Sequence, residues 1–354
     1  MNKLRWGILS TAGIARKNWR AIRDSGNCVV TAVASRDATR SADFITNCQT
    51  EFPAATMPVA LGSYEDLIAS KNVDAVYIPL PTGLRKEWVL RAAEAGKHVL
   101  CEKPCGLSLA DVQEMTEVCK KNRVQFMDGV MFMHNPRLGR IREFLDDGKS
   151  VGQLKRIMSV FTFATAEEFF GANIRVHSEL EPTGCLGDLG WYCLRFSLWA
   201  MNWQLPREVN GRILSQRGNR QSPAPSPTDF SGELIFNEDT SAGFYCSFLA
   251  EKQQWANVSG AKGNLRLPDF VHPDSVHEPS FEVNQSEQRV KCCDCGALHT
   301  DSHAMAQDSQ MFRNFANQVV SGKLNDDWPM WALKTQQVMD ACYESARKDR
   351  SVKL

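Results

Sequence analysis

The chain has 354 residues, 43% of them apolar and 23% charged, which is enough for two domains with sizeable cores. Lysine plus arginine equals aspartate plus glutamate, 41 each, and this balance gives no support to a nucleic-acid partner. No apolar run reaches bilayer length, and the N-terminus enters a strand pattern at once, so we expect no signal peptide. The 12 cysteines lack small-scaffold spacing and fit reduced thiols. We therefore expect a cytoplasmic protein without a membrane partner.

Strand and helix patterns alternate along the first third of the chain. The predicted strands are 4–9, 28–34, 74–80, 98–100 and 124–127. Helical stretches of ten or more residues separate most of them. Such alternation predicts an α/β fold with a doubly wound parallel sheet of the Rossmann type. We place this domain at residues 1–128.

The first strand leads through a turn of small residues into a helix, as in the dinucleotide fingerprint G-x-G-x-x-G/A. Ser10, Ala12 and Ala15 hold the three fingerprint positions, so the first two glycines are missing. Small residues still let a pyrophosphate approach the backbone amides. Thr11 could add a hydroxyl, and Ile14 opens the helix. An ordinary tight turn is the alternative reading of this stretch alone.

The second predicted strand ends in residues that suit a phosphorylated ribose. An acidic residue at this position takes the 2′-hydroxyl of NAD, whereas an arginine accommodates the 2′-phosphate of NADP. Ser35 is not acidic, and Arg36 and Arg40 follow it. Asp37 leaves NAD open, because a carboxylate two residues later could still reach a ribose hydroxyl.

Two further strands end in candidate site residues at the same edge of the predicted sheet. Strand 98–100 delivers Cys101-Glu102-Lys103-Pro104, and strand 74–80 ends at Leu80 and Pro81. Open parallel sheets bind ligands at the carboxyl ends of their strands. Lys103 could orient a substrate hydroxyl or favour ionisation of a neighbouring acid. The alternative is a surface lysine at a turn.

The second part of the chain, residues 129–354, shows a different pattern. Strand-like runs over 155–165, 207–216, 229–236, 241–249 and 264–267 follow one another with little helix between them. They predict an α+β domain with a large open, mostly antiparallel sheet. Residues 217–228 are expected to form a loop. Two helices, roughly 304–321 and 330–348, close the chain, and we expect the last to pack back on the first domain.

A second set of candidate residues lies near the middle of this domain. Asp188 and Tyr192 are four residues apart on a predicted helix and so share one face. An acid and a phenol so placed could bind and deprotonate a carbinol, and a lysine ammonium nearby would favour the phenolate. Arg175 could clamp substrate oxygens. The alternative is an acid favoured by the helix dipole, a buried tyrosine and a surface arginine.

Cysteines and histidines gather near residue 295 without a metal-site spacing. They are Cys292, Cys293, Cys295, His299 and His303. Adjacent cysteines are not the C-x₂-C pair of zinc sites, and no second pair follows. We therefore predict a surface loop and no metal.

Over nearly its whole length the chain resembles the Gfo/Idh/MocA oxidoreductases. The resemblance rests on Ala92–Pro104, on Gly-x-x-x-Asp-x-Gly-x-Tyr around Asp188, and on the C-terminal Phe312-x-x-Phe315-Ala316, Ser321-Gly322 and Ser345-Ala346-Arg347. Tyr192 and Asn173-Ile174-Arg175 look like the branch of glucose–fructose oxidoreductase and dimeric dihydrodiol dehydrogenase. The chain departs from the family at two places. Pro81-Thr82-x-x-Arg85 replaces the usual Pro-Asn-x-x-His, and 131–136 lacks the usual tyrosine or tryptophan and arginine.

The resemblance implies a Rossmann domain and a second domain whose open sheet often forms a dimer interface. It implies hydride transfer between a nicotinamide, here NADP rather than NAD, and a sugar, cyclic polyol or dihydrodiol. The substrate would lie between the domains, with Lys103 and Tyr192 as the proton-handling pair and Asp188 and Arg175 orienting it. Glu102 would belong to the cofactor site. A non-catalytic dinucleotide or sugar sensor on the same scaffold is the alternative.

Overall fold

The structure is a computed structural model that describes residues 3–218, 220–222, 224–273, 280–293 and 303–354. The chain forms two compact units, and each is described by itself. The first comprises Met1–Gly106, Ala110–Asn135 and His299–Ala332. The second comprises Leu107–Leu109, Pro136–Leu298 and Leu333–Leu354.

The first unit is built on a six-stranded parallel sheet with the order β3-β2-β1-β4-β5-β6. Its strands are β1 (Leu4–Leu9), β2 (Cys28–Ala34), β3 (Val59–Leu61), β4 (Ala75–Ile78), β5 (His98–Cys101) and β6 (Phe126–Asp128). The strand order reverses between β1 and β4, where doubly wound sheets bind their ligands. The predicted Rossmann-type sheet is confirmed. Strand β3 has only three residues, which is too short a run to be predicted from its pattern.

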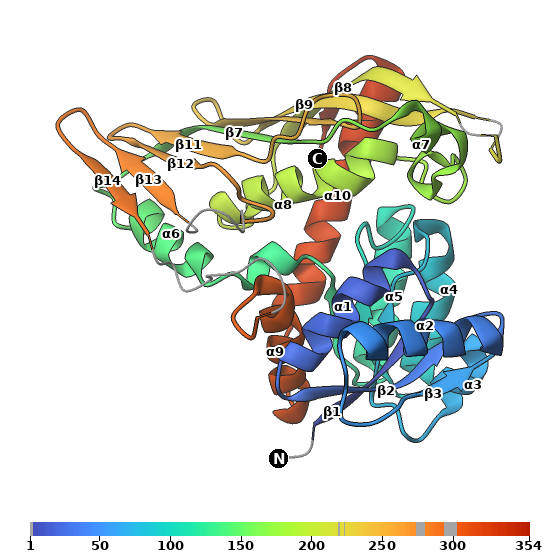
Figure 1. Ribbon diagram of the computed structural model, residues 1–354. Helices are drawn as coiled ribbons and strands as arrows, with labels where there is room; N and C mark the ends of the chain where they lie inside the picture. The colour runs from blue at the N-terminus through green and yellow to red at the C-terminus, as the bar shows by residue number, and fades with distance from the viewer. Residues whose placement is uncertain (1–2, 219, 223, 274–279, 294–302) are drawn as a thin grey trace. The chain divides into compact units, whose positions relative to one another are not determined.

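Helices follow most of these strands, and one returns from the far end of the sequence. They are α1 (Gly13–Asp24), α2 (Ala38–Glu51), α3 (Tyr64–Ala69), α4 (Thr82–Glu94), α5 (Leu109–Lys121), η1 (Met131–His134) and α9 (Gln307–Val320). Helix α9 lies beside α1 (Figure 1). Its Phe312 and Phe315 rings each lie 5.1 Å from the Trp6 ring of β1. The C-terminal part of the chain thus completes the core of the first unit.

The second unit carries a nine-stranded sheet with the order β14-β13-β12-β11-β7-β10-β9-β8-β15. Its strands are β7 (Leu154–Thr162), β8 (Glu208–Arg217), β9 (Ser226–Ile235), β10 (Ser241–Ser247), β11 (Ala256–Gly260), β12 (Asn264–Leu267), β13 (Phe281–Asn284), β14 (Arg289–Cys292) and β15 (Val352–Lys353). Only β7 and β10 pair in parallel among these described strands. The predicted large, mostly antiparallel sheet is confirmed.

Helical segments of the second unit pack on this sheet and bring residues toward the candidate site. They are α6 (Arg137–Asp146), α7 (Glu167–Ala172), η2 (Ile174–Val176), η3 (Leu186–Gly190), α8 (Trp191–Ala200) and the end of α10 (Asp327–Lys348). All ten residues of α8 are buried, and the helix contacts β7 and β10. Gly184, with a φ of 48°, precedes η3, and a Cβ there would lie 2.1 Å from the Pro227 carbonyl oxygen. Only glycine therefore fits at this entry. In the part of the chain that the structure describes, we find no helix both long and apolar enough to cross a membrane.

Candidate active site

The turn between β1 and α1 presents the amino end of a helix. Ser10 occupies the first fingerprint position with a φ of 143°, a conformation that L side chains rarely adopt. Its Oγ accepts a hydrogen bond of 3.1 Å from the Ala12 amide, which fixes the turn. A Cβ at Gly13 would meet no atom within 4 Å, and the first turn of α1 holds no acidic residue. The turn is therefore open to an anion at the helix amino end.

The carboxyl end of β2 is shaped by the buried side chain of Ser35. Its Oγ donates to the Asp37 carbonyl oxygen at 2.6 Å and accepts from the Asp37 amide at 3.2 Å. The Asp37 carboxylate caps α2 by accepting the Thr39 amide at 2.8 Å. Arg36 and Arg40 are exposed, and their positive charges act on the phenol of Tyr64. This end of the sheet thus carries two exposed arginines, while its acidic side chain already serves as a helix cap.

At the carboxyl end of β5 a buried network holds Glu102. The Tyr77 hydroxyl donates to Glu102 Oε1 at 2.6 Å and accepts from Asn18 Nδ2 at 2.6 Å. Glu102 Oε2 accepts the backbone amide of Lys103 at 3.2 Å. Burial and the Glu102 carboxylate raise the pKa of Tyr77 well above its usual range, so the phenol stays a proton donor. Three elements, α1, β4 and β5, thereby fix the backbone that leads into Lys103.

Gly129, directly after β6, closes over the same carboxylate. Its amide donates to the Cys101 carbonyl oxygen at 2.8 Å. A Cβ there would lie 3.1 Å from Glu102 Oε1, so a larger residue would push against the buried acid. Gly129 therefore allows the close approach of β6 to the Glu102 side chain.

Leu80 and Pro81 lie at the carboxyl end of β4, directly before α4. Leu80 is buried, and its carbonyl oxygen accepts a hydrogen bond from Arg85. Arg85, which stands where the family usually has histidine, is itself buried and also bonds Thr82 and the Pro104 carbonyl oxygen. Lys103 and Pro104 are joined by a cis peptide bond. The structure thus brings the ends of β4 and β5 together around one arginine.

In the second unit, Arg175 and Asp188 form an ion pair. Arg175 Nε donates to Asp188 Oδ2 at 2.8 Å, and the Asp188 carboxylate raises the pKa of the Arg175 guanidinium. A Tyr192 phenolate would likewise raise the pKa of the Arg175 guanidinium. Tyr192 is buried, and its ring lies 5.5 Å from the Phe161 ring of β7. The three candidate residues of this unit therefore lie in one neighbourhood.

Two short helical segments follow the long strand β7, and Arg175 lies in the second of them. Strand β7 ends at Thr162, and the short helices α7 and η2 come after it. Asn173 caps η2, because its Oδ1 accepts the Arg175 amide at 3.0 Å. His177 follows η2 and is buried, with Nδ1 accepting the Glu179 amide at 3.3 Å. The cap at Asn173 sets the backbone from which Arg175 reaches Asp188.

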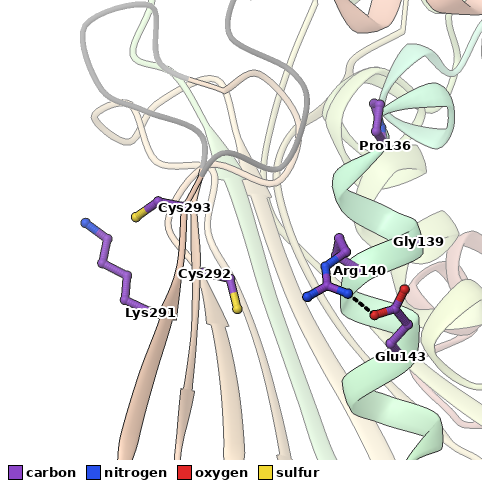
Figure 2. A pocket seen from close by; sticks show the side chains of 7 residues that line it. All are labelled: Pro136, Gly139, Arg140, Glu143, Lys291, Cys292 and Cys293. Atoms are coloured by element: carbon purple, nitrogen blue, oxygen red, sulfur yellow. Dashed lines mark hydrogen bonds and ion pairs between the residues drawn. The ribbon is translucent and has the colours of Figure 1, made fainter.

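The cysteine-rich stretch is described only in part. Cys292 ends β14, and Cys292 and Cys293 line a pocket with Arg140 and Glu143 of α6 (Figure 2). Burial raises the pKa of the Cys292 thiol. Among the residues that the structure describes, no cluster of three His, Cys, Asp or Glu could hold a metal ion. Cys295 and His299 lie outside the described residues, so the absence of a metal here stays a prediction.

The predicted site residues thus form two groups, one in each unit. Ser10, Ser35, Leu80 and Glu102 follow strands that end at the same edge of the parallel sheet. The sequence reading missed Asn18 and Tyr77, which hold Glu102. The sequence does carry one signal for this network, because Tyr77 places a hydroxyl within the otherwise apolar strand Ala75–Ile78.

The comparisons with known proteins agree with this architecture. The model "Oxidoreductase family, NAD-binding Rossmann fold" matches residues 4–130, and the model "GFO/IDH/MocA C-terminal domain" matches residues 139–266. D-xylose 1-dehydrogenase (NADP(+)) 2 of Haloferax volcanii is 28% identical over 99% of each chain. Trans-1,2-dihydrobenzene-1,2-diol dehydrogenase of Bos taurus is 31% identical over 75% of this chain and 74% of its own.

A solved structure gives the same picture. A 3-ketoreductase from Actinomadura kijaniata, in complex with NADP and TDP-benzene, superposes with a TM-score of 0.82. It is 25% identical, and the match covers 97% of this chain and 98% of the ketoreductase. Both family models, the whole-length relatives and the strand order lead to one conclusion: the chain belongs to the Gfo/Idh/MocA family of oxidoreductases.

Proposed function

We propose that the protein is an NADP-dependent oxidoreductase acting on a carbinol or ketone carbon of a sugar, cyclic polyol or dihydrodiol. The observation that carries the proposal is the buried Asn18–Tyr77–Glu102 network, which fixes the backbone of Lys103 at the carboxyl end of β5. A lysine in this place of a nucleotide-binding fold suits proton handling next to a dinucleotide. The NADP-dependent xylose dehydrogenase and the dihydrodiol dehydrogenase support the substrate class.

The residues of the first unit fit NADP. The open amino end of α1 after Ser10 would hold the pyrophosphate, and the exposed Arg36 and Arg40 would hold the 2′-phosphate. Asp37, whose carboxylate could otherwise bind a ribose hydroxyl of NAD, caps α2 instead. Leu80, Pro81 and Glu102, at the ends of β4 and β5, would border the other half of the dinucleotide. When bound, the nicotinamide supplies or accepts the hydride.

The proton would be handled by Lys103 and Tyr192. A lysine ammonium close to a phenol favours the phenolate, so Lys103 would help Tyr192 to act as a base. Asp188 would accept a hydrogen bond from a substrate hydroxyl, and Arg175 would donate to another oxygen. Their 2.8 Å ion pair holds acceptor and donor at a fixed spacing.

The test is an activity screen with both cofactors. We expect aldoses, cyclic polyols or dihydrodiols to change the nicotinamide absorbance, with NADP preferred over NAD in kcat/KM. The reverse direction is followed with the matching ketones or lactones. A protein that binds NADPH tightly and turns over none of these compounds would be a sensor, and the proposal would fail.

We further propose a homodimer, or a higher homo-oligomer, in the cytoplasm. The support is the nine-stranded sheet of the second unit, whose β7, β9 and β10 carry Arg156, Glu233 and Ser241 in one partly exposed cluster. Light scattering coupled to size exclusion should give at least twice the mass of one chain, and fractionation of cells should place the protein in the cytoplasm. A monomer at micromolar concentration would contradict the oligomer.

A further inference from the structure

Arg85 is a buried arginine whose guanidinium joins three segments of the first unit. Its Nε donates to the Leu80 carbonyl oxygen at 2.7 Å, at the end of β4. Its Nη1 donates to Thr82 Oγ1 at 2.9 Å, at the start of α4, and to the Pro104 carbonyl oxygen, after β5. The residue is only 6% exposed. One side chain therefore ties the end of one strand to the loop that follows the next.

The acceptors of Arg85 are all neutral. Among the described residues, no carboxylate forms an ion pair with it, and its hydrogen-bond acceptors are two carbonyl oxygens and one hydroxyl. Burying a guanidinium without an opposite charge costs free energy, so an apolar residue of similar size would fill this space at less cost. Its planar fork can reach separate acceptors with fixed geometry, which a lysine or histidine cannot do. The geometry of the fork is the property that this site uses.

We propose that Arg85 is a positioning residue for Lys103, acting through the carbonyl oxygen of Pro104. This inference rests on the proposed role of Lys103. Glu102 and the Tyr77 network hold the residue before Lys103, and Arg85 holds the residue after it. Lys103 is thus fixed from both sides.

The test compares Arg85→Gln and Arg85→Lys with the control Arg91→Gln. Arg91 lies on the same helix but is exposed, where it pairs with Glu65 and Glu87. We expect Arg85→Gln to lower kcat by about 10²-fold, the usual result of displacing a catalytic group by about 1 Å, with a smaller change in KM. Arg85→Lys should lie between, because it keeps the charge and loses the fork.

A second measurement does not depend on activity. Cys105 follows Pro104 and is fully buried. N-ethylmaleimide labelling of Cys105, followed by peptide mass spectrometry, should be at least about tenfold faster in Arg85→Gln than in the control, because local opening of the loop exposes the thiol. If Arg85→Gln does not fold, kcat and the rate of Cys105 labelling are measured in Arg85→Lys instead, where kcat should be lower and labelling faster than in the wild type.

The outcomes are distinct. Cys105 labelling equal to that of the control would overturn the inference whether or not the wild type is active. Faster labelling with unchanged kcat would also overturn it, because the loop would be held by Arg85 without any benefit to Lys103. A wild type that turns over nothing would defeat the proposed function, while the labelling result would still show whether Arg85 holds the loop.

Discussion

Tyr77 and Glu102 are joined by a buried hydrogen bond of 2.6 Å in which the phenol donates to the carboxylate. The bond links β4 to the residue that follows β5, and Asn18 of α1 supports it from the other side. Because the pKa of Tyr77 is raised by burial and by Glu102, the phenol is a donor at every physiological pH. The negative charge of Glu102 therefore keeps its hydrogen-bond partner.

Tyr77→Phe should destabilise the protein by about 1–3 kcal/mol, because it leaves both Asn18 Nδ2 and Glu102 Oε1 buried without their partner. Urea unfolding measures this, and NADPH turnover should fall with it. Tyr343→Phe is the control, since that hydroxyl donates a longer bond of 3.3 Å to the Pro182 carbonyl oxygen. Equal losses of stability in both variants would mean that the Tyr77 hydroxyl stabilises the fold no more than the Tyr343 hydroxyl does.

Replacing Arg36 and Arg40 together by Gln should weaken NADPH binding while leaving NADH binding nearly unchanged. Both side chains are exposed, so the fold should tolerate the change. Ser35→Asp is a less clean test, because the Ser35 hydroxyl holds its own turn. Fluorescence titration with both cofactors gives the ratio of dissociation constants. If NADH affinity falls as much as NADPH affinity, the arginines do not read the 2′-phosphate.

At position 10, alanine should be tolerated less well than glycine. Ser10→Gly relieves the strain of a φ of 143° but loses the hydrogen bond to the Ala12 amide, so its stability should change by less than about 1 kcal/mol. Ser10→Ala keeps the strain and loses the bond, and should cost about 1 kcal/mol or more. Thermal unfolding compares the two. An alanine variant as stable as the glycine variant would show that the backbone here is unstrained.

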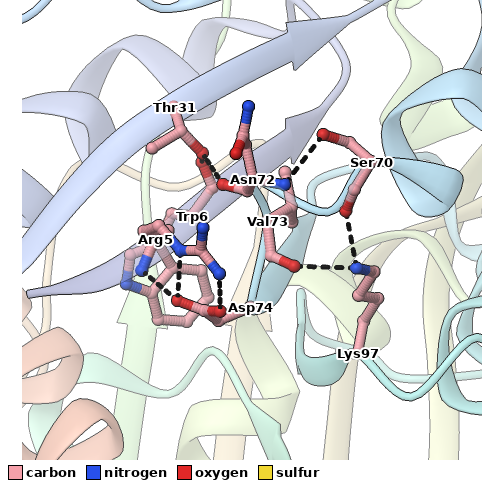
Figure 3. Close-up of polar contacts among 8 residues, drawn as sticks. All are labelled: Arg5, Trp6, Thr31, Ser70, Asn72, Val73, Asp74 and Lys97. Atoms are coloured by element: carbon pink, nitrogen blue, oxygen red, sulfur yellow. Dashed lines mark hydrogen bonds and ion pairs between the residues drawn. The ribbon is translucent and has the colours of Figure 1, made fainter.

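At the amino end of the same sheet, Arg5 and Asp74 join β1 to the residue before β4 (Figure 3). The Arg5 side chain donates to both carboxylate oxygens, at 2.9 and 2.6 Å, and its amide donates at 3.0 Å. Partial burial is the largest single effect on Asp74 and opposes ionisation. The bonds and charge of Arg5 together outweigh it and lower the pKa of Asp74 below its usual 3.8.

A lowered pKa makes the contribution of Asp74 to stability depend on pH. The contribution is fully present above the unfolded value near 3.8 and is lost as the pH falls through the lower folded value. Asp74→Asn should therefore cost roughly 1 kcal/mol at pH 7 and less at pH 3. Urea midpoints at both pH values measure this, with Asp326→Asn, at an exposed pair with Lys120, as control. A loss that is the same at pH 3 and pH 7 would contradict it.

Much of the fold follows from patterns that the sequence carries locally. The period of the apolar residues and the length of each run distinguish strands such as Cys28–Ala34 from the amphipathic helices between them. This alternation of strand and helix predicts the parallel sheet. Ser63 caps α3 by accepting the Asp66 amide at 3.1 Å, and a serine followed three residues later by an acidic residue is a local signal for such a helix start. Strand β15 has only two residues, Val352 and Lys353, and no local pattern could reveal it.

The site was predicted less completely, because its supporting residues depend on contacts far apart in sequence. Glu102 and Lys103 stand out from their motif, but Tyr77 lies 25 positions away from Glu102 and Asn18 lies 59 positions from Tyr77. Arg85 reads as a departure from a family pattern, and only its three acceptors show what the arginine does. Such bonds depend on which strands become neighbours, and that order is a property of the whole sheet.

We expect Lys103 and Tyr192 to act as one proton-transfer unit in an NADP-dependent oxidoreductase. The decisive experiment compares kcat for Lys103→Met, Tyr192→Phe and the double variant on one substrate, with NADPH affinity measured alongside. Each single change should lower kcat by about 10²- to 10⁴-fold with little change in NADPH affinity. The double variant should lose little more than the worse single one, because groups that act as a unit are not additive. Full activity in both single variants, or losses that multiply in the double variant, would contradict the claim.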